Sequence, residues 1–435
     1  MKRGMKRIIK TALASSVAVV ALLALSSCSQ QSASSSAVAT AEHPMVLTLA
    51  HGLSETHTVH KAISQFADEV KDRTNGRIQI KIFANGQLGS ELEQMEQVMA
   101  GVLSMTKVAS PMLATYDDSY HAFGLPYIFN DTKDFYTVMD SDPMYGFFKS
   151  SYDKGFVTLT YYTSGARSFY TVNKPIRTPA DLKGLKIRVQ DMKSQTEMVS
   201  VMGGTPVAMA YGDVFTSLQT GLIDGTENNE TALTLGKHGE ICKVYSTDQH
   251  AMIPDALVVS SKVWDNITPE DQAIMIEASR HSTVSHQGMW DQAVEDAIAE
   301  AKRDMGVTFI NDVDKDAFRQ ATSGMLSKYS EQYPGVKNLL ALINSIRDSE
   351  AYKQNMDPAA PAIPVVSPVA APVTAPADNA SAAADNAAVT PADSTSNAGD
   401  SAGSAAAAVD SAAADSAADA VDSAADAVDS AADAA

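Results

Sequence analysis

The order of hydrophobic and polar positions over residues 44–357 predicts short strands that alternate with amphipathic helices. The first elements are expected as strand, helix, strand, helix and strand at residues 45–50, 57–74, 77–83, 91–100 and 104–109. In the first helix, Ala62, Phe66 and Val70 fall on one face, as in a helix that covers a sheet. This order is typical of an α/β sheet with parallel strand pairs and helical cover.

A second run of strands and helices begins at residue 156. Strands are expected at 156–162, 169–173, 185–190, 206–209 and 222–227, and helices at 194–202 and 213–219, with a helix start at 178–182. A strand at 256–260 is expected to return to the first unit. Thr268, followed by proline and two acidic residues, opens a long helix that ends near Asp304. Two α/β units joined by crossing strands predict two lobes with a cleft between them.

The N-terminus has the pattern of a secretory signal. Five basic residues precede an apolar run from Thr11 to Leu25 that is short for a membrane span. The run ends in Leu-Ser-Ser-Cys, which resembles a lipobox with Cys28 as the lipidated residue. We therefore expect a lipoprotein signal peptide at 1–27 and a Ser/Ala-rich flexible tether at 28–43, which would hold an exported protein at the periplasmic face or the cell surface. Ordinary signal cleavage with a freely soluble product is the alternative.

The C-terminal segment has a different composition. Residues 358–435 contain no lysine, arginine or aromatic residue and are rich in alanine, aspartate and serine. Such a segment cannot bury a core and is predicted to be a disordered, solvated tail. The spacing of Asp415, Asp419 and Asp422 leaves an alternative, a helix with one acidic stripe that binds a partner.

Charge and cysteine content narrow the function classes. The chain has a formal net charge of −19, and the part between the basic N-terminus and the tail is acidic as well, which argues against nucleic-acid binding. If Cys28 carries lipid, Cys242 has no disulfide partner. Cys242 lies in an apolar stretch and is expected to be a small core residue rather than a reactive thiol.

Two arginines stand out near the ends of predicted strands. Arg188 lies in an otherwise apolar strand, and Arg167 holds a similar place near the preceding one. Ligands of open α/β folds bind at such strand ends, and a guanidinium matches a carboxylate with two parallel hydrogen bonds. The residues therefore predict a pocket for an anion. A structural salt bridge is the alternative for either arginine taken alone.

Six short sequence blocks, in this order along the chain, narrow the choice of protein family. They are Leu-Ala-His at 49–51 with His57 and His60, Phe-Ala-Asn-Gly-Gln-Leu-Gly-Ser-Glu at 83–91, Leu-Pro-Tyr-Ile-Phe at 125–129, Gly-Ala-Arg at 165–167, Lys-Ile-Arg-Val at 186–189, and Leu-Gln-x-Gly-x-x-Asp-Gly-x-Glu-Asn at 218–228. With these blocks, residues 45–356 resemble the solute-binding subunit of tripartite ATP-independent periplasmic (TRAP) transporters, of the dicarboxylate-receptor type. The lipobox is a partial departure from that family, and the acidic tail lies outside its pattern.

The resemblance implies a two-lobed, periplasmic-binding-protein-like (type II) α/β fold, with a ligand cleft between the lobes and a long helix spanning both. It places one lobe at 44–165 plus 255–357, including C-terminal helices, and the other at 166–254. Such a receptor would capture a small organic acid by cleft closure and deliver it to the integral membrane subunits of an ion-gradient-driven transporter. A monomer is expected.

The resemblance also assigns site residues. Arg188 would pair with the ligand carboxylate, Arg167 would add a second charged contact, Asn228 would hydrogen-bond the carboxylate, and Tyr211 would flank the ligand. On the first lobe, the candidates for the other end of the ligand are His57, Glu91 and Ser110. A C4-dicarboxylate, a sugar acid, a 2-oxo acid and a sialic acid would all use the same arginine.

Enzyme chemistry finds little support in the sequence. His51, His57 and His60 are close together, but their spacing matches no metal motif, and residues 44–357 lack a glycine-rich nucleotide loop. We expect no catalytic residue, cofactor or metal. The remaining alternative is a ligand-sensing or adhesive surface lipoprotein that uses the same fold.

Overall fold

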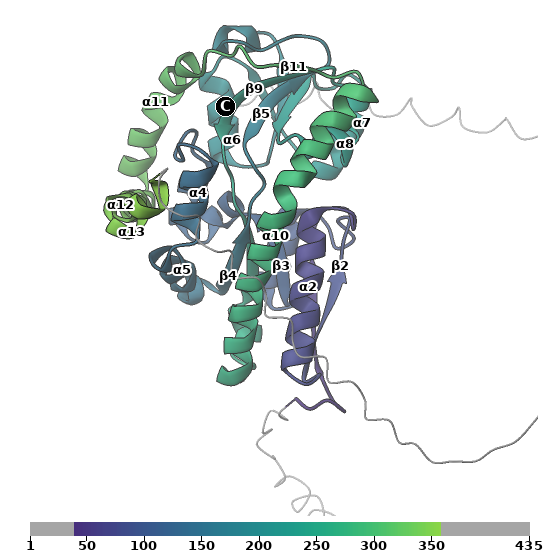
Figure 1. Ribbon diagram of the computed structural model, residues 1–435, viewed down its shortest axis with the longest axis vertical. Helices are drawn as coiled ribbons and strands as arrows, with labels where there is room; N and C mark the ends of the chain where they lie inside the picture. Colours follow the sequence, from purple (N-terminus) through teal and green to yellow (C-terminus); the bar gives the residue numbers. More distant parts are fainter. Residues whose placement is uncertain (1–38, 358–435) are drawn as a thin grey trace, which may run out of the picture. The chain divides into compact units, whose positions relative to one another are not determined.

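The structure is a computed structural model that describes residues 39–357 (Figure 1). The predicted signal peptide, Cys28, most of the tether and the acidic tail lie outside these residues. The described part contains two sheets, which form the cores of two lobes. Among residues 39–357 there is no helix whose length and apolar character would suffice to span a bilayer.

The first sheet has the strand order β2-β1-β3-β10-β4. Its strands are β1 (Met45–Ala50), β2 (Ile78–Phe83), β3 (Met105–Ala109), β4 (Phe156–Tyr162) and β10 (Asp255–Ser260), and its helices include α2 (Thr58–Arg73), α3 (Glu91–Ala100) and α9 (Ser261–Trp264). β1 pairs in parallel with β2 and β3, as the strand–helix order predicts. β10 runs antiparallel between β3 and β4, which confirms that this late strand returns to the first unit.

The second sheet has the order β11-β9-β5-β8-β6-β7. Its strands are β5 (Arg167–Thr171), β6 (Lys186–Val189), β7 (Thr205–Ala208), β8 (Gly225–Asn228), β9 (Val244–Ala251) and β11 (Thr308–Ile310), with helices α6 (Lys193–Val201), α7 (Val214–Gln219) and α8 (Thr231–Thr234). β6 is parallel to both of its neighbours, whereas β5 is antiparallel to β8 and β9.

Three features of the second sheet and the segments around it differ from the sequence prediction. β9 was not expected, because its buried residues include Asp248 and His250, which hide the strand from a hydrophobic pattern. β11 pairs with β9, although residues 255–357 were assigned to the first lobe. The helix start expected at 178–182 is a single 3₁₀ turn, η4 (Pro179–Leu182).

The long helix α10 (Pro269–Arg303) has 35 residues and runs past both sheets (Figure 1). It packs against α2 and β4 of the first lobe and against α8 of the second. Thr268 caps its N-terminus by accepting a hydrogen bond from the backbone N–H of Asp271, as its sequence indicates. The prediction of one long helix spanning two α/β lobes is thereby confirmed.

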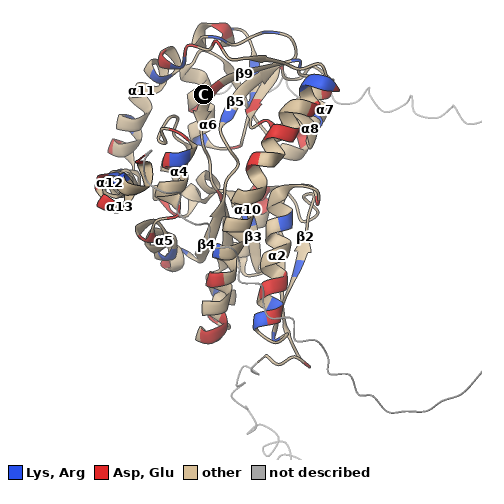
Figure 2. Cartoon of the chain, in the orientation of Figure 1, with Lys and Arg blue, Asp and Glu red and all other residues tan. Residues whose placement is uncertain are grey.

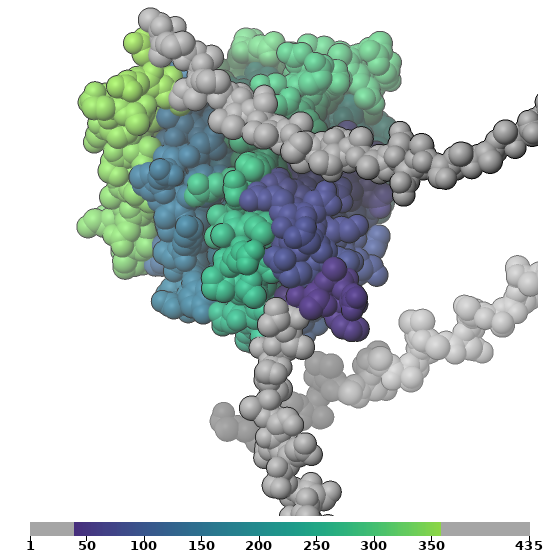
Figure 3. Space-filling view, turned by 60° about the horizontal axis from the view of Figure 1, so that its bottom comes forward, coloured from purple at the N-terminus to yellow at the C-terminus, as the bar shows by residue number. Residues whose placement is uncertain are grey.

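A helical layer covers one side of the first lobe and continues onto β9 and α6 of the second lobe. It consists of α4 (Thr132–Met139), α5 (Asp142–Lys149), α11 (Lys315–Gln332), α12 (Pro334–Asp348), α13 (Glu350–Met356) and the 3₁₀ turns η1 (Ser110–Thr115), η2 (Asp118–Gly124) and η3 (Ser150–Lys154). α12 contacts η2 and α13 contacts α4, so the end of the described chain lies against residues 110–150 (Figure 3).

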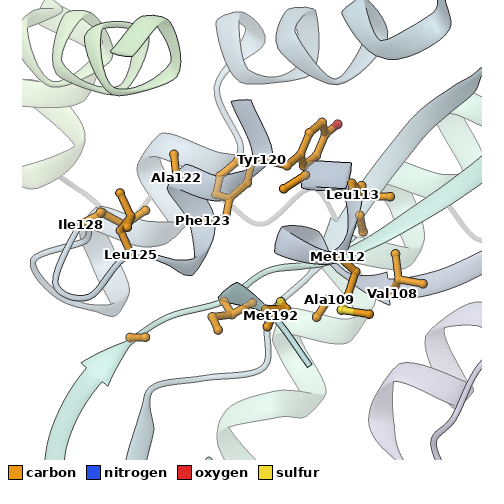
Figure 4. Packing of buried hydrophobic residues seen from close by; sticks show 14 of the residues in the cluster. Val108, Ala109, Met112, Leu113, Tyr120, Ala122, Phe123, Leu125, Ile128 and Met192 are labelled. Carbon is orange, nitrogen blue, oxygen red and sulfur yellow. The ribbon is translucent and has the colours of Figure 1, made fainter. Parts of the chain in front are cut away.

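The largest apolar cluster joins elements of both lobes. Figure 4 shows Met112, Tyr120 and Phe123 of the η1–η2 region packed near Met192, which precedes α6. Cys242 is fully buried in a separate apolar cluster of the second lobe, where burial raises the pKa of its thiol to about 12. It is the inert core residue that the sequence predicts.

Candidate functional site

A cavity of about 470 Å³ is lined by residues of both lobes. His57, Glu91, Arg167, Arg188, Tyr211 and Asn228 all line it. Ser110 is not among the lining residues; it is fully buried at the start of η1, and its hydroxyl has no hydrogen-bond partner within residues 39–357. The fold thus gathers six of the expected side chains around one space, while their contacts with a ligand remain predictions.

Arg188 projects from β6 into the cavity. Its neighbours Ile187 and Val189 are fully buried in the apolar core, so strand alternation turns the guanidinium to the other face. Its Nε and Nη2 both donate to the carbonyl oxygen of Met209, at 3.1 and 2.8 Å. Arg188 has an exposed fraction of only 2%. Even so, no carboxylate oxygen of residues 39–357 forms an ion pair with it within 4.0 Å. A buried cation held by a neutral acceptor is suited to bind an anion.

Burial lowers the pKa of Arg188, and the positive charge of Arg167 acts in the same direction, whereas Glu227 raises it. Arginine nevertheless stays protonated at physiological pH. The cavity therefore holds a positive charge whose desolvation is poorly compensated within the protein. An anionic ligand would supply that compensation.

Arg167 has a different environment. Its Nε and Nη2 donate to the two carboxylate oxygens of Glu227, at 2.5 and 2.9 Å, and both side chains are buried. Its Nη1 donates to Oδ1 of Asn228 at 2.8 Å. The structural salt bridge that the sequence left open for an arginine is thus present at Arg167, which also lines the cavity.

This ion pair belongs to a larger buried network. His250 contacts Asp248 at 2.6 Å and Glu227 at 3.3 Å. Burial alone would lower the pKa of His250, but Asp248 and Glu227 raise it to about 9. Burial likewise would raise the pKa of Glu227, but Arg167 and His250 lower it to about 2. The network holds charged groups rigidly behind the second-lobe wall of the cavity.

The first-lobe wall is positioned by two helix N-termini. Ser90 caps α3 in a reciprocal capping box with Glu93, which places Glu91 in the first turn at the cavity. Glu91 accepts hydrogen bonds from Nζ of Lys107 at 2.7 Å and from the backbone N–H of Ala109 at 3.1 Å. His57 caps α2 through Nδ1, and burial lowers its pKa, so it is neutral at physiological pH.

Tyr211 lies at the start of the short turn η5 (Tyr211–Asp213), next to η6 (His238–Glu240). Its ring centroid is 5.6 Å from that of His238, whose Nδ1 lies 2.7 Å from the hydroxyl of Tyr170. An aromatic ring held in this way can form one side of a ligand pocket.

Several lining residues were not foreseen from the sequence, among them Gln190, Lys107 and Asp255. Gln190 follows Arg188 by two positions, so strand alternation could have placed it on the same face. Lys107 and Asp255 are paired across β3 and β10, a long-range contact that no sequence spacing reveals. Within residues 39–357 there is no group of three His, Cys, Asp or Glu side chains arranged to hold a metal ion.

Comparison with known proteins decides the family. Residues 49–332 match the model of the bacterial extracellular solute-binding proteins, family 7. The chain belongs to this family. Its members are the solute receptors of TRAP transporters, so the protein is a binding receptor and not an enzyme.

The matches between this receptor and its relatives cover most of the length of each relative. An uncharacterized protein of Salmonella typhimurium, YiiZ, is 36% identical over 297 residues, which cover 67% of this chain and 87% of that protein. The 2,3-diketo-L-gulonate-binding periplasmic protein YiaO of Escherichia coli is 26% identical over 302 residues, or 69% and 92% of the two chains.

Solved structures agree with the fold. A TRAP periplasmic solute-binding protein of Anaerococcus prevotii with bound D-glucuronate is 31% identical, with a TM-score of 0.67 and coverage of 70% of this chain and 98% of that one. One of Xanthobacter autotrophicus with bound β-D-galacturonate is 34% identical, with a TM-score of 0.66 and coverage of 70% and 100%.

Proposed function

We propose that this receptor captures a small organic acid outside the cytoplasm by closing its two lobes, and delivers it to the membrane subunits of an ion-gradient-driven TRAP transporter. The observation that carries the proposal is Arg188, a buried cation at the cavity whose hydrogen bonds go to the carbonyl oxygen of Met209. A ligand carboxylate would give it a charged partner with matching geometry. The ligands of the two solved relatives are also acids.

The link between the lobes supports closure as the mechanism. Residues 163–166 connect β4 to β5, and residues 252–254 connect β9 to β10, so two short segments cross between the sheets. We propose that lobe one comprises 44–165 with 255–357, apart from the edge strand β11, and lobe two 166–254. Ligand contacts made in the closed form would shift the population towards it.

In this proposal Arg188 pairs with the carboxylate and Asn228 adds a hydrogen bond. The side-chain oxygen of Asn228 accepts hydrogen bonds from Nη1 of Arg167 and from the backbone and side-chain N–H groups of Asn229. Its amide nitrogen has no hydrogen-bond partner within residues 39–357. Arg167 orients Asn228 and adds positive charge. Tyr211 flanks the ligand, while His57 and Glu91 face its other end.

We further propose that the protein is exported, loses residues 1–27 and is held at the membrane by lipid on Cys28, and that it acts as a monomer. The support for the anchor is the lipobox pattern before the Ser/Ala-rich segment.

The experiment is a thermal-shift screen of the purified protein against organic acids and their matching amides. A ligand at 100 times its dissociation constant adds about 2.7 kcal/mol of stability. We expect stabilisation by at least one acid and not by its amide. Stabilisation by neutral sugars alone, or by no acid, would contradict the proposal.

The ligand-sensing or adhesive alternative would show the same binding, so transport must be measured as well. Uptake of the labelled acid by vesicles that contain the transporter's membrane subunits is expected to require the receptor. Uptake that does not depend on it would favour the alternative.

A further inference from the structure

Tyr211 lies at the end of a row of aromatic rings that runs from the core of the second lobe to the cavity. Tyr245 and Tyr170 are fully buried, and their rings stack with a centroid distance of 5.7 Å and an interplanar angle of 15°. Tyr170 stacks in turn on His238, at 5.9 Å and 27°. The ring of His238 lies 5.6 Å from that of Tyr211. Of these four residues Tyr211 alone lines the cavity, so the other three support it from behind.

His238 is held in a fixed orientation. Its Nδ1 lies 2.7 Å from the hydroxyl of Tyr170, and the residue is buried. Burial, and after it the charge of Arg188, lower the pKa of His238 to about 3, so the imidazole is neutral at physiological pH. A neutral ring does not repel the cavity arginine. Because the ring cannot turn freely, it gives Tyr211 a constant surface on which to pack.

Gly236 leaves open the space that the hydroxyl of Tyr211 occupies. A Cβ atom at Gly236 would lie 2.6 Å from that hydroxyl oxygen, 2.8 Å from the carbonyl oxygen of Ala232 and 3.0 Å from Nε2 of His238. These distances are shorter than a carbon atom tolerates in a packed interior. An added methyl group would therefore force Tyr211, His238 or the end of α8 to move.

Backbone conformation does not account for this glycine. A glycine just after a helix commonly adopts the left-handed conformation, but Gly236, which follows α8, is not among the glycines with positive φ. The left-handed residue is Lys237, with φ +58°, although a Cβ atom makes this conformation unfavourable. The glycine thus stands where Tyr211 needs room and not where the chain needs a left-handed residue.

The segment that carries Tyr211 also holds Arg188. Met209, two residues earlier, accepts the hydrogen bonds from Nε and Nη2 of Arg188, and its own N–H donates to the carbonyl oxygen of Val189. A displacement of the Tyr211 ring would therefore shift the carbonyl group that orients the guanidinium.

We infer that Gly236 and His238 are positioning residues for ligand capture: Gly236 leaves room for the hydroxyl of Tyr211, and His238 supports its ring. They hold Tyr211 and Arg188 in place before an acid arrives, which lowers the entropic cost of binding. Neither of the two residues lines the cavity. The inference rests on the proposed function, because it assumes that an acid binds between Arg188 and Tyr211.

The first test needs no ligand. The purified full chain is labelled with fluorotyrosine, and the fluorine resonance of Tyr211 is assigned by its loss in Tyr211→Phe. We expect Gly236→Ala and His238→Asn to shift or broaden this resonance. Gly324→Ala is the control, because Gly324 is exposed on α11 and an added Cβ would have no atom within 4 Å. An unchanged Tyr211 resonance in a folded variant would overturn the role of the residue that was replaced.

The second test is calorimetric titration with D-glucuronate, the acid bound by the relative from Anaerococcus prevotii. His238→Asn removes the ring but keeps a polar group near the hydroxyl of Tyr170. It should weaken binding about fivefold or more in wild type and less than about twofold in a Tyr211→Ala background, because effects that pass through one contact are not additive. An equal loss in both backgrounds would overturn the role of His238.

A second pair of backgrounds tests Gly236. Tyr211→Phe removes the atom that would lie closest to an added methyl group, so Gly236→Ala should weaken D-glucuronate binding less in Tyr211→Phe than in wild type. Equal losses with and without the hydroxyl would show that Ala232 is the group that moves, and would overturn the role of Gly236.

These outcomes separate the inference from the proposed function. If wild type binds an acid and neither variant changes its affinity, the proposed function stands and the inference falls. If wild type binds another acid and not D-glucuronate, that acid replaces it in the same titrations. If no acid binds in the wider screen, both fall.

Discussion

Arg167 and Glu227 form a buried ion pair across the antiparallel strands β5 and β8, with N–O distances of 2.5 and 2.9 Å. Arg167 also donates to the carbonyl oxygen of Glu227 and to Oδ1 of Asn228. Arg188, by contrast, donates to one carbonyl oxygen. The two cavity arginines therefore differ in role. Arg167 uses its N–H donors on groups of the protein, whereas Arg188 has N–H donors left for a ligand.

Arg188→Met should abolish tight ligand binding while leaving the fold intact. The substitution removes the charged partner of the ligand carboxylate, which we expect to cost about 3–5 kcal/mol, or more than a hundredfold in Kd. Calorimetric titration with the acid identified in the screen measures it. Arg177→Met is the control, because Arg177 is exposed and pairs with Asp312. Binding by Arg188→Met within about threefold of wild type would refute the role of Arg188.

Arg167→Met should instead destabilise the protein. It leaves the buried carboxylate of Glu227 without its main partner, a change that costs about 3–5 kcal/mol in other buried pairs. Urea denaturation compares its free energy of unfolding with those of wild type and Arg188→Met. A stability equal to that of wild type, together with lost binding, would mean that Arg167 is a direct ligand group rather than a support.

The sequence predicts the helices and strands of this molecule better than the contacts between its buried charged groups. The parallel strands, α3 and α10 follow from alternation, helical spacing and capping residues, which act over a few positions. β9 could not be predicted, because Asp248 and His250 are buried there through partners far away in the sequence. For the same reason, Arg188 could be placed at a strand end, but neither the Arg167–Glu227 pair nor the contact of Lys107 with Asp255 was foreseen.

Basic and acidic residues alternate along much of the described chain, and the absence of nucleic-acid binding stays a prediction from the sequence. Figure 2 shows basic and acidic residues interspersed over the described chain, and the formal net charge of the whole chain is −19. A phosphate backbone requires a basic face, which such a distribution does not favour.

The free energy of unfolding should fall as the pH rises from about 6.5 to 9. The pKa of His250 is raised from 6.5 to about 9 in the folded state, against the effect of burial, by Asp248 and Glu227. Its stabilising contribution is therefore complete below pH 6.5 and is lost as the pH rises through 9, since the unfolded chain releases the proton first. Urea denaturation at pH 6.5, 8 and 9.5 measures the slope.

His250→Gln is the control for that slope. The variant is expected to be less stable than wild type at pH 6.5. Its free energy of unfolding should also fall less between pH 6.5 and 9.5, by about the amount that the release of one proton contributes. An identical slope in both proteins would show that His250 is not the titrating group.

Cys28→Ser should move the protein from the membrane fraction to the soluble fraction. Acyl chains on Cys28 would anchor the protein, because each buried CH₂ contributes about 0.8 kcal/mol. Cell fractionation and immunoblotting measure the distribution, and Cys242→Ser serves as a control in which the lipobox is intact. Continued sedimentation of Cys28→Ser with membranes would rule out lipid on Cys28 as the anchor.

Gly165→Ala should cost more stability than Gly184→Ala, although both glycines have positive φ values, +63° and +82°. The left-handed conformation alone costs about 1–2 kcal/mol for a residue with a Cβ atom. At Gly184 a Cβ would have no described atom within 4 Å, whereas at Gly165 it would lie 3.0 Å from Cζ2 of Trp290. Trp290 belongs to α10, and Gly165 lies on the segment that crosses from β4 to β5, so the added methyl group would push the long helix away from the crossing segment. Urea denaturation of both variants measures this packing effect as the difference between their free energies of unfolding. Equal decreases in the two variants would show that Trp290 can move aside without cost.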